Sequence, residues 1–215
     1  MANPSYGGFR VWGTFTGGEG VIPSPFVQEV ANNYNTALGI GDIIIPVSDG
    51  TVARAAASNN GLLLGVIVGV SYVASGIGQG RRYLTNYLPA STTFTPTTVG
   101  SQNASLIAYV PLTPDVILEA DTSTTTTDAA TAIGHIGENV DLATGTADTI
   151  TGVSAFCLDG TTFNTTTANF RVIGIRGYSL NAGFSTLAND PTTTRFKYLV
   201  TCNEGFLPPY TTSGV

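Results

Sequence analysis

The sequence predicts an all-β protein, a single β-barrel or sandwich domain with an extended N-terminal arm and almost no helix. Three observations support this fold class. The 215 residues are 42% hydrophobic and only 10% charged, whereas a soluble domain is typically about 25% charged. Short runs rich in Val, Ile and Tyr alternate with turns rich in Gly, Asn, Asp and Thr. No amphipathic segment is long enough for a useful helix, which argues against a parallel β/α arrangement.

Residues 1–35 differ in composition and are predicted to form an extended arm, separate from a β-domain at residues 36–215. Gly and Pro are frequent here and exclude a regular helix. Aromatic side chains interleave with them, and buried aromatics dominate interface energies. We therefore predict that the arm binds a partner, and the candidate contact residues are Phe9, Arg10, Trp12, Phe15 and Phe26. The alternative is a first strand packed on its own domain.

The β-domain is expected to open with a hairpin. Residues 43–47 and 51–55 flank an Asp49-Gly50 turn of a type that favours tight hairpins. The apolar run at residues 62–72 contains two glycines, which indicate a bulge or a barrel bend.

About ten short strands are expected in all, with one helical turn between them. That turn should run from Asp128 to Ile133, with Asp128 as its N-cap. The other strands are expected at residues 81–88, 106–112, 116–120, 139–142, 151–158, 170–180 and 195–202.

Charge and hydropathy exclude two classes of partner. The net charge is −6 with eight basic residues, too few for a nucleic-acid interface. No apolar stretch reaches the roughly 18 residues of a membrane helix, and no secretory leader is expected at the N-terminus. Cys157 and Cys202 are accordingly expected to be buried, reduced thiols, since a disulfide would need their strands to be neighbours.

The candidates for nucleophilic or metal chemistry are weak. The one histidine, His135, lies between isoleucines and glycines. Ser154 lies in the sequence GVSAF, where Phe156 occupies the position at which a nucleophile elbow has glycine. One histidine and two distant cysteines do not suit zinc. We therefore expect no enzyme activity, no metal and no cofactor, with a small hydrolase as the alternative.

Eight carboxylates lie between Asp115 and Asp159 with no Arg or Lys among them. A solvated acidic face is the simpler interpretation. The sharper one is a glycosidase pair or calcium site built from Asp115, Glu119 and Asp121, because Glu119 and Asp121 share a strand face. The glycine-rich sequence GIGQG at residues 76–80 lacks the Lys-Ser/Thr pair of a phosphate loop, so no nucleotide site is expected.

Several blocks of sequence resemble small structural proteins of tailed-phage heads in their order and spacing. The resemblance is to capsid decoration, or cement, proteins, and it covers about residues 39–204. The blocks are GDII at 41–44, DGTV at 49–52, LGVIVG at 64–69, VILEA at 116–120, IGENVDL at 136–142, TGVS at 151–154, FRVIG at 170–174 and YLVTCN at 198–203.

This resemblance implies a non-enzymatic β-domain, made in the host cytoplasm and fixed to the outer surface of an icosahedral virion. There it would bridge neighbouring subunits of the major capsid protein. The low-charge, Thr-rich composition independently favours association. We expect a homo-oligomer, a trimer at three-fold positions or else a dimer. The alternatives are a tail, baseplate or head-fibre component and, more remotely, a carbohydrate-binding module that uses Tyr72, Tyr83, Tyr87 and Tyr178.

Overall fold

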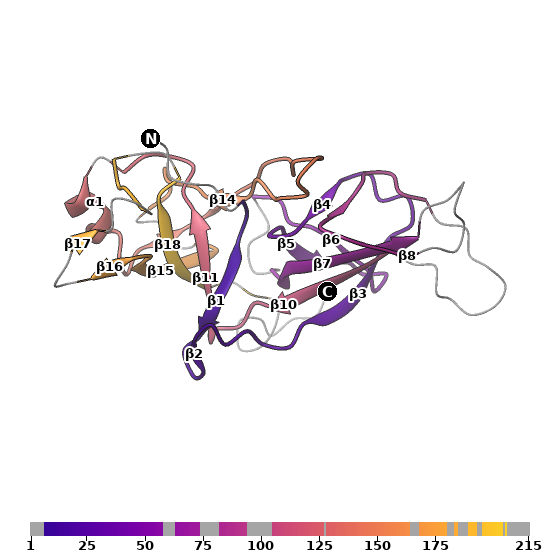
Figure 1. Ribbon diagram of the computed structural model, residues 1–215, viewed down its shortest axis with the longest axis horizontal. Coiled ribbons are helices and arrows are strands. Elements are labelled where there is room, and N and C mark those ends of the chain that lie inside the picture. Colours follow the sequence, from indigo (N-terminus) through magenta and orange to yellow (C-terminus); the bar gives the residue numbers. More distant parts are fainter. Residues whose placement is uncertain are drawn as a thin grey trace.

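The computed structural model describes residues 7–57, 63–73, 82–93, 105–126, 128–163, 168–179, 183–184, 189–192, 195–203 and 205. Within these residues the chain forms strands and one short helix, which confirms the predicted all-β class. The molecule is elongated, and its two larger sheets lie one after the other along the long axis (Figure 1).

The first sheet draws its strands from both ends of the chain. All neighbours in it are antiparallel, and β1 pairs with β11 on one side and β2 on the other. In spatial order the strands are β12 (Asn139–Val140), β15 (Phe170–Ile175), β18 (Lys197–Cys202), β11 (Val116–Asp121), β1 (Arg10–Thr14) and β2 (Gly18–Glu19).

The second sheet closes into a five-stranded barrel. Its closure is the pairing of β10 with β7, and β8 (Arg82–Thr85) extends the wall beside the C-terminal half of β7. The five strands in order are β10 (Ser105–Pro111), β3 (Phe26–Val30), β6 (Val52–Arg54), β5 (Ile43–Pro46) and β7 (Gly65–Val73).

One of the two glycines of β7 lies beside a bulge, as predicted from the sequence, and the other allows close contact with a ring. The register shifts beside Gly69, which pairs with Ala108 while Ile67 pairs with Tyr109, so one extra residue bulges from β7. A Cβ on Gly65 would lie 2.3 Å from Cδ2 of Tyr109, so the ring packs directly on the glycine backbone.

Short elements complete the fold. Helix α1 (Ala129–Gly134) begins where the Asp128 carboxylate accepts a hydrogen bond from the Thr131 amide, as expected. The strand expected at 151–158 is reduced to its last two residues, because the chain before them forms a turn closed by Asp148. The small pairs are β4 (Leu38–Gly39) with β9 (Tyr87–Leu88), β13 (Leu142–Ala143) with β14 (Cys157–Leu158), and β16 (Tyr178–Ser179) with β17 (Gly183–Phe184).

One hydrophobic core joins the first sheet to the barrel wall. It brings Phe9, Leu118 and Tyr198 of the first-sheet side together with Ile43 and Val110 of the barrel. A second cluster lies between the barrel strands and includes Val30, Ile44, Leu64, Ile67 and Ile107. The barrel and the first sheet are therefore packed as one unit.

The structure corrects the boundary between the arm and the domain. Residues 7–35 are largely extended, as predicted, but β1 is an interior strand of the first sheet and β3 is a wall of the barrel. The N-terminal segment is thus part of both sheets rather than an arm separate from residues 36–215. The sequence alternative, a first strand packed on its own domain, holds for β1.

Candidate functional site

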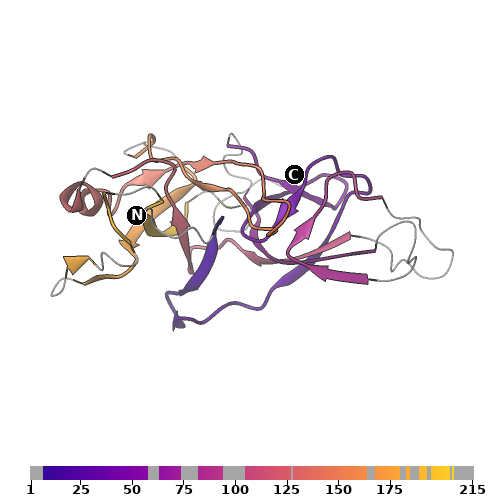
Figure 2. The same ribbon diagram turned by 45° about the horizontal axis from the view of Figure 1, so that its top comes forward.

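An exposed apolar segment connects the two sheets. Residues 15–27 leave the first sheet at β1, contain β2 and enter the barrel at β3, along one side of the molecule in both views (Figure 1, Figure 2). All thirteen residues except Pro23 are exposed, and Glu19 is the one charged residue. Among the described residues, five of the ten exposed large hydrophobic side chains lie here: Phe15, Val21, Ile22, Phe26 and Val27. Exposed apolar surface of this kind marks an interaction site.

The predicted contact residues divide between this segment and the protein interior. Phe15 and Phe26 are 57% and 59% exposed, and Phe26 stacks on the barrel residue Tyr109 with ring centres 6.1 Å apart. Arg10 is also exposed. Phe9 is wrong as a contact residue, because it is only 2% exposed and packs in the core. Trp12 is half-buried.

Three apolar residues of the segment were missed from the sequence. Val21, Ile22 and Val27 carry no aromatic ring, whereas the sequence prediction rested on aromatic anchors. The sequence did contain a signal for an exposed apolar surface. Val21 and Ile22 are adjacent apolar residues between Gly20 and Pro23, outside any alternating strand pattern that would bury them.

The exposed surface continues from Val27 into a groove on the outer wall of the barrel. This groove has a volume of about 600 Å³ and is lined by β3, β7, β8 and β10, with Leu84 84% exposed at its side. The groove is open at Gly69 because this residue has no side chain. A Cβ added there would meet only the Ala108 methyl group, at 3.6 Å. The 15–27 segment and this groove together form the candidate interaction surface.

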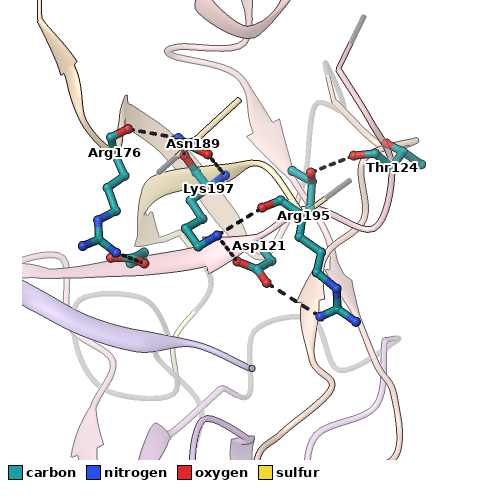
Figure 3. A network of polar contacts seen from close by, with 8 residues as sticks. Asp121, Thr124, Arg176, Asn189, Arg195 and Lys197 are labelled. Atoms are coloured by element: carbon teal, nitrogen blue, oxygen red, sulfur yellow. Dashed lines mark hydrogen bonds and ion pairs between the residues drawn. The ribbon is translucent and has the colours of Figure 1, made fainter. Parts of the chain in front are cut away.

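A buried charged network lies at the other end of the molecule. Lys197 is the only lysine of the chain and is fully buried. Its Nζ lies 3.5 Å from Oδ1 of Asp121 and donates to the Arg195 carbonyl, while Nη1 of Arg195 lies 3.8 Å from Oδ2 of Asp121 (Figure 3). The Asn189 side chain binds both the amide and the carbonyl of Lys197.

A second buried carboxylate, that of Glu119, lies on β11 together with Asp121. Oε1 of Glu119 accepts a hydrogen bond of 2.7 Å from Arg176, whose guanidinium carbon lies 4.9 Å from the centre of the Trp12 ring. The structure therefore brings Glu119 and Asp121 into buried pairs with cations. It leaves Asp115 elsewhere, bound to the amide and hydroxyl of Thr16.

Glu119 and Asp121, the carboxylates considered for a glycosidase pair or calcium site, are each paired with a cation. Within the described part of the chain, no group of three or more His, Cys, Asp or Glu side chains is placed to hold a metal ion. The acidic stretch is also not simply a solvated face, since the cations that pair with Glu119 and Asp121 lie on β18, just before β18 and just after its neighbour β15.

A third polar network fixes the barrel to the loop before β14. Asp42 is fully buried and accepts from Arg54, from the Ser154 hydroxyl and from the Gly39 amide. Arg54 also donates to the Gly145 carbonyl, and its guanidinium lies 4.1 Å from the Phe156 ring centre. Burial raises the pKa of the Asp42 carboxyl, and Arg54 opposes this shift.

The serine and histidine singled out from the sequence belong to different networks. Ser154 is buried and donates to Asp42, while its oxygen accepts from the Phe156 amide. His135 caps the end of α1, where Nδ1 lies 2.7 Å from Glu138 and the ring stacks on Phe163. The two residues are therefore held as structural contacts and not as a nucleophile and its base.

The two cysteines are free thiols, as predicted, but only Cys202 is buried. Burial raises the pKa of the Cys157 thiol, and the nearby Asp121 carboxylate raises it further. We expect alkylation of native Cys157 to be slow at neutral pH and to accelerate as the pH increases, with Cys202 reacting only after denaturation. Peptide mass spectrometry measures both rates. The absence of any reactive thiol after denaturation without reductant would indicate a disulfide instead.

The tyrosines proposed for sugar binding differ in their surroundings. Tyr72 and Tyr83 stack on each other across β7 and β8, with ring centres 5.6 Å apart. Tyr87 is half-buried. The side chain of Tyr178 and the glycine-rich loop 76–80 lie outside the described residues.

Comparison with known proteins adds no relative. The chain matches no family model, no curated protein and no solved structure. In the described residues, no helix is both long and apolar enough to cross a membrane.

Proposed function

We propose that the chain is a structural virion protein that decorates the outside of an icosahedral phage capsid and cements neighbouring major capsid subunits. The observation that carries the proposal is the apolar 15–27 segment, exposed over nearly its whole length with a single charge. Exposed apolar surface is unfavourable in a free monomer and becomes favourable against a partner. The order of the decoration-like sequence blocks supports the capsid as that partner.

The polar chemistry of the described residues supports a structural function. Three buried carboxylates pair with cations, and each pair connects two strands or a strand and a loop. The pairs are Asp42 with Arg54, Glu119 with Arg176, and Asp121 with Lys197. Such contacts fix sheet geometry. A cementing protein needs this rigidity because it transmits load between subunits.

Capsid binding should depend on the 15–27 segment. In a Phe15→Ser/Phe26→Ser variant we expect binding to undecorated capsids to weaken at least tenfold, since two exposed rings are removed and interface aromatics contribute about 2 kcal/mol or more as hot spots. Co-sedimentation with capsids measures the affinity. The matched control is Ile136→Ser, which removes an apolar side chain that is 40% exposed after α1.

The same co-sedimentation assay with isolated tails distinguishes a head protein from a tail or baseplate component. Binding to tails and not to capsids contradicts the proposal. Capsid binding that both variants retain places the interface elsewhere on the molecule.

Self-association is part of the proposal. In the described residues, β2, β8 and β12 are terminal strands of their sheets, and strand edges with little charge favour pairing between copies. We propose a trimer at three-fold positions, with a dimer as the alternative. Sedimentation of the purified chain, alone and after release from capsids, distinguishes these states from a monomer.

A further inference from the structure

The only lysine of the chain is placed against a carboxylate in the protein interior. Lys197 on β18 and Asp121 on β11 are directly opposite each other in an antiparallel pair. The two side chains are 1% and 7% exposed, and Nζ of Lys197 lies 3.5 Å from Oδ1 of Asp121 (Figure 3). This arrangement does not depend on the proposed capsid function.

An amine and a carboxyl held in this way can react with each other as well as form an ion pair. Burying two charges carries a desolvation penalty that their attraction only partly offsets. Two groups in fixed contact also react as if at an effective concentration of about 10⁵–10⁸ M when their geometry is productive. Amide formation removes both charges and releases one water molecule.

We propose that Lys197 and Asp121 condense into an intramolecular isopeptide bond. A proton passes from the Lys197 ammonium to the Asp121 carboxylate, which leaves a neutral amine beside a neutral acid. The amine nitrogen attacks Cγ of Asp121 and forms the C–N bond. One carboxyl oxygen then leaves as water and takes up a proton from the nitrogen. No oxidant or other reactant is needed, and the net charge of the pair is zero before and after.

Neighbouring residues hold the two reacting groups in place. The Arg195 carbonyl accepts from Nζ of Lys197 and positions the nitrogen. The Arg195 guanidinium faces the other oxygen of Asp121, where it stabilises the negative charge of the tetrahedral intermediate. Asn189 fixes the backbone of Lys197 on both sides.

Glu119 is assigned as the proton relay. It lies two residues before Asp121 on the same strand, so both side chains leave the same sheet face. Arg176 holds Oε1, whereas Oε2 is buried and has no hydrogen-bond partner in the structure. A buried carboxylate oxygen without a partner is uncommon, and this one can accept a proton from the attacking nitrogen and return it to the leaving oxygen.

The bond has a direct test in the unmodified full-length protein. Trypsin cannot cleave after an acylated Lys197, so digestion of the denatured chain should give one branched species. It joins residues 83–171 to residues 196–215, and its mass is the sum of the two peptides less one water. Dehydration at Asp49-Gly50 or Asp159-Gly160, which also removes one water, leaves the two peptides separate. Separate peptides with cleavage after Lys197 overturn the proposal and leave an ordinary buried ion pair.

Variants test the roles of the individual residues. Lys197→Arg and Asp121→Ala should each abolish the branched species. Glu119→Gln should abolish it or slow its formation severalfold in a time course after synthesis, while Glu29→Gln, at an exposed position on β3, should leave it unchanged. A branched species formed at the normal rate in Glu119→Gln overturns the relay assignment. Far-UV circular dichroism confirms that each compared variant is folded.

Discussion

Replacing Asp42 with alanine should lower the free energy of unfolding by about 3–5 kcal/mol, because removal of one partner leaves a buried charge unpaired. Arg54 would lose its carboxylate at a site where its side chain is only 13% exposed. The Gly39 amide and the Ser154 hydroxyl would lose their acceptor as well. Urea-induced unfolding, followed by tryptophan fluorescence, measures the change.

Two controls make this prediction specific. Asp49→Ala removes an exposed carboxylate from a turn that is held by hydrogen bonds to Thr51, so its effect should be much smaller. Ser154→Ala removes one donor to Asp42 and the acceptor of the Phe156 amide, and should cost about 1–3 kcal/mol. An Asp42→Ala variant as stable as Asp49→Ala contradicts the importance assigned to this network.

The Asp42 carboxyl should make the free energy of unfolding depend on pH in a direction set by its pKa shift. Burial raises the folded-state pKa of Asp42 above the unfolded value of 3.8. The stability that arises from this raised pKa is therefore fully present below the unfolded pKa and is lost as the pH rises through the folded pKa. The destabilisation caused by Asp42→Ala should accordingly be larger at about pH 4 than at about pH 7. A difference that grows with increasing pH would contradict the direction of the shift.

Two phenylalanines six positions apart should behave in opposite ways when replaced by alanine. Phe9 stacks on Phe170 at 4.8 Å between ring centres and is 2% exposed. Phe9→Ala should therefore destabilise the fold by about 3–5 kcal/mol through the cavity that it leaves. Phe15 is 57% exposed, so Phe15→Ala should change the stability by no more than about 0.5 kcal/mol.

Thermal and urea unfolding of both variants measure this contrast. Equal stability of Phe9→Ala and the unmodified protein would mean that β1 is dispensable for folding, as expected of a separate arm. A large loss in Phe15→Ala would mean that its ring is buried in solution.

Local pattern predicted much of the fold. The predicted runs at 43–47, 106–112, 116–120 and 170–180 each contain a strand, because alternation and β-branched residues are local signals. The cap at Asp128 was equally local. The prediction failed where the decisive partner is distant in sequence, as for β1, which was assigned to an extended arm because its partner β11 comes much later in the chain.

The buried ionic pairs could not be predicted for the same reason. Asp121 lies in an acidic stretch without Arg or Lys, and its cations come from residues 195 and 197. Only the solitary lysine hinted at a special environment. Similarly, composition singled out the N-terminal segment but could not show which of its rings face the core.

The order of the strands along the chain has a consequence for synthesis on the ribosome. Every barrel strand lies between residues 26 and 111, whereas the first sheet combines β1 and β2 with strands from residue 116 to residue 202. At about 5–20 residues per second, roughly 5–20 seconds separate the end of β10 from the end of β18. The barrel can therefore close cotranslationally while β1 is paired only with β2, and the nascent chain must keep Phe9 from aggregating until β11 emerges.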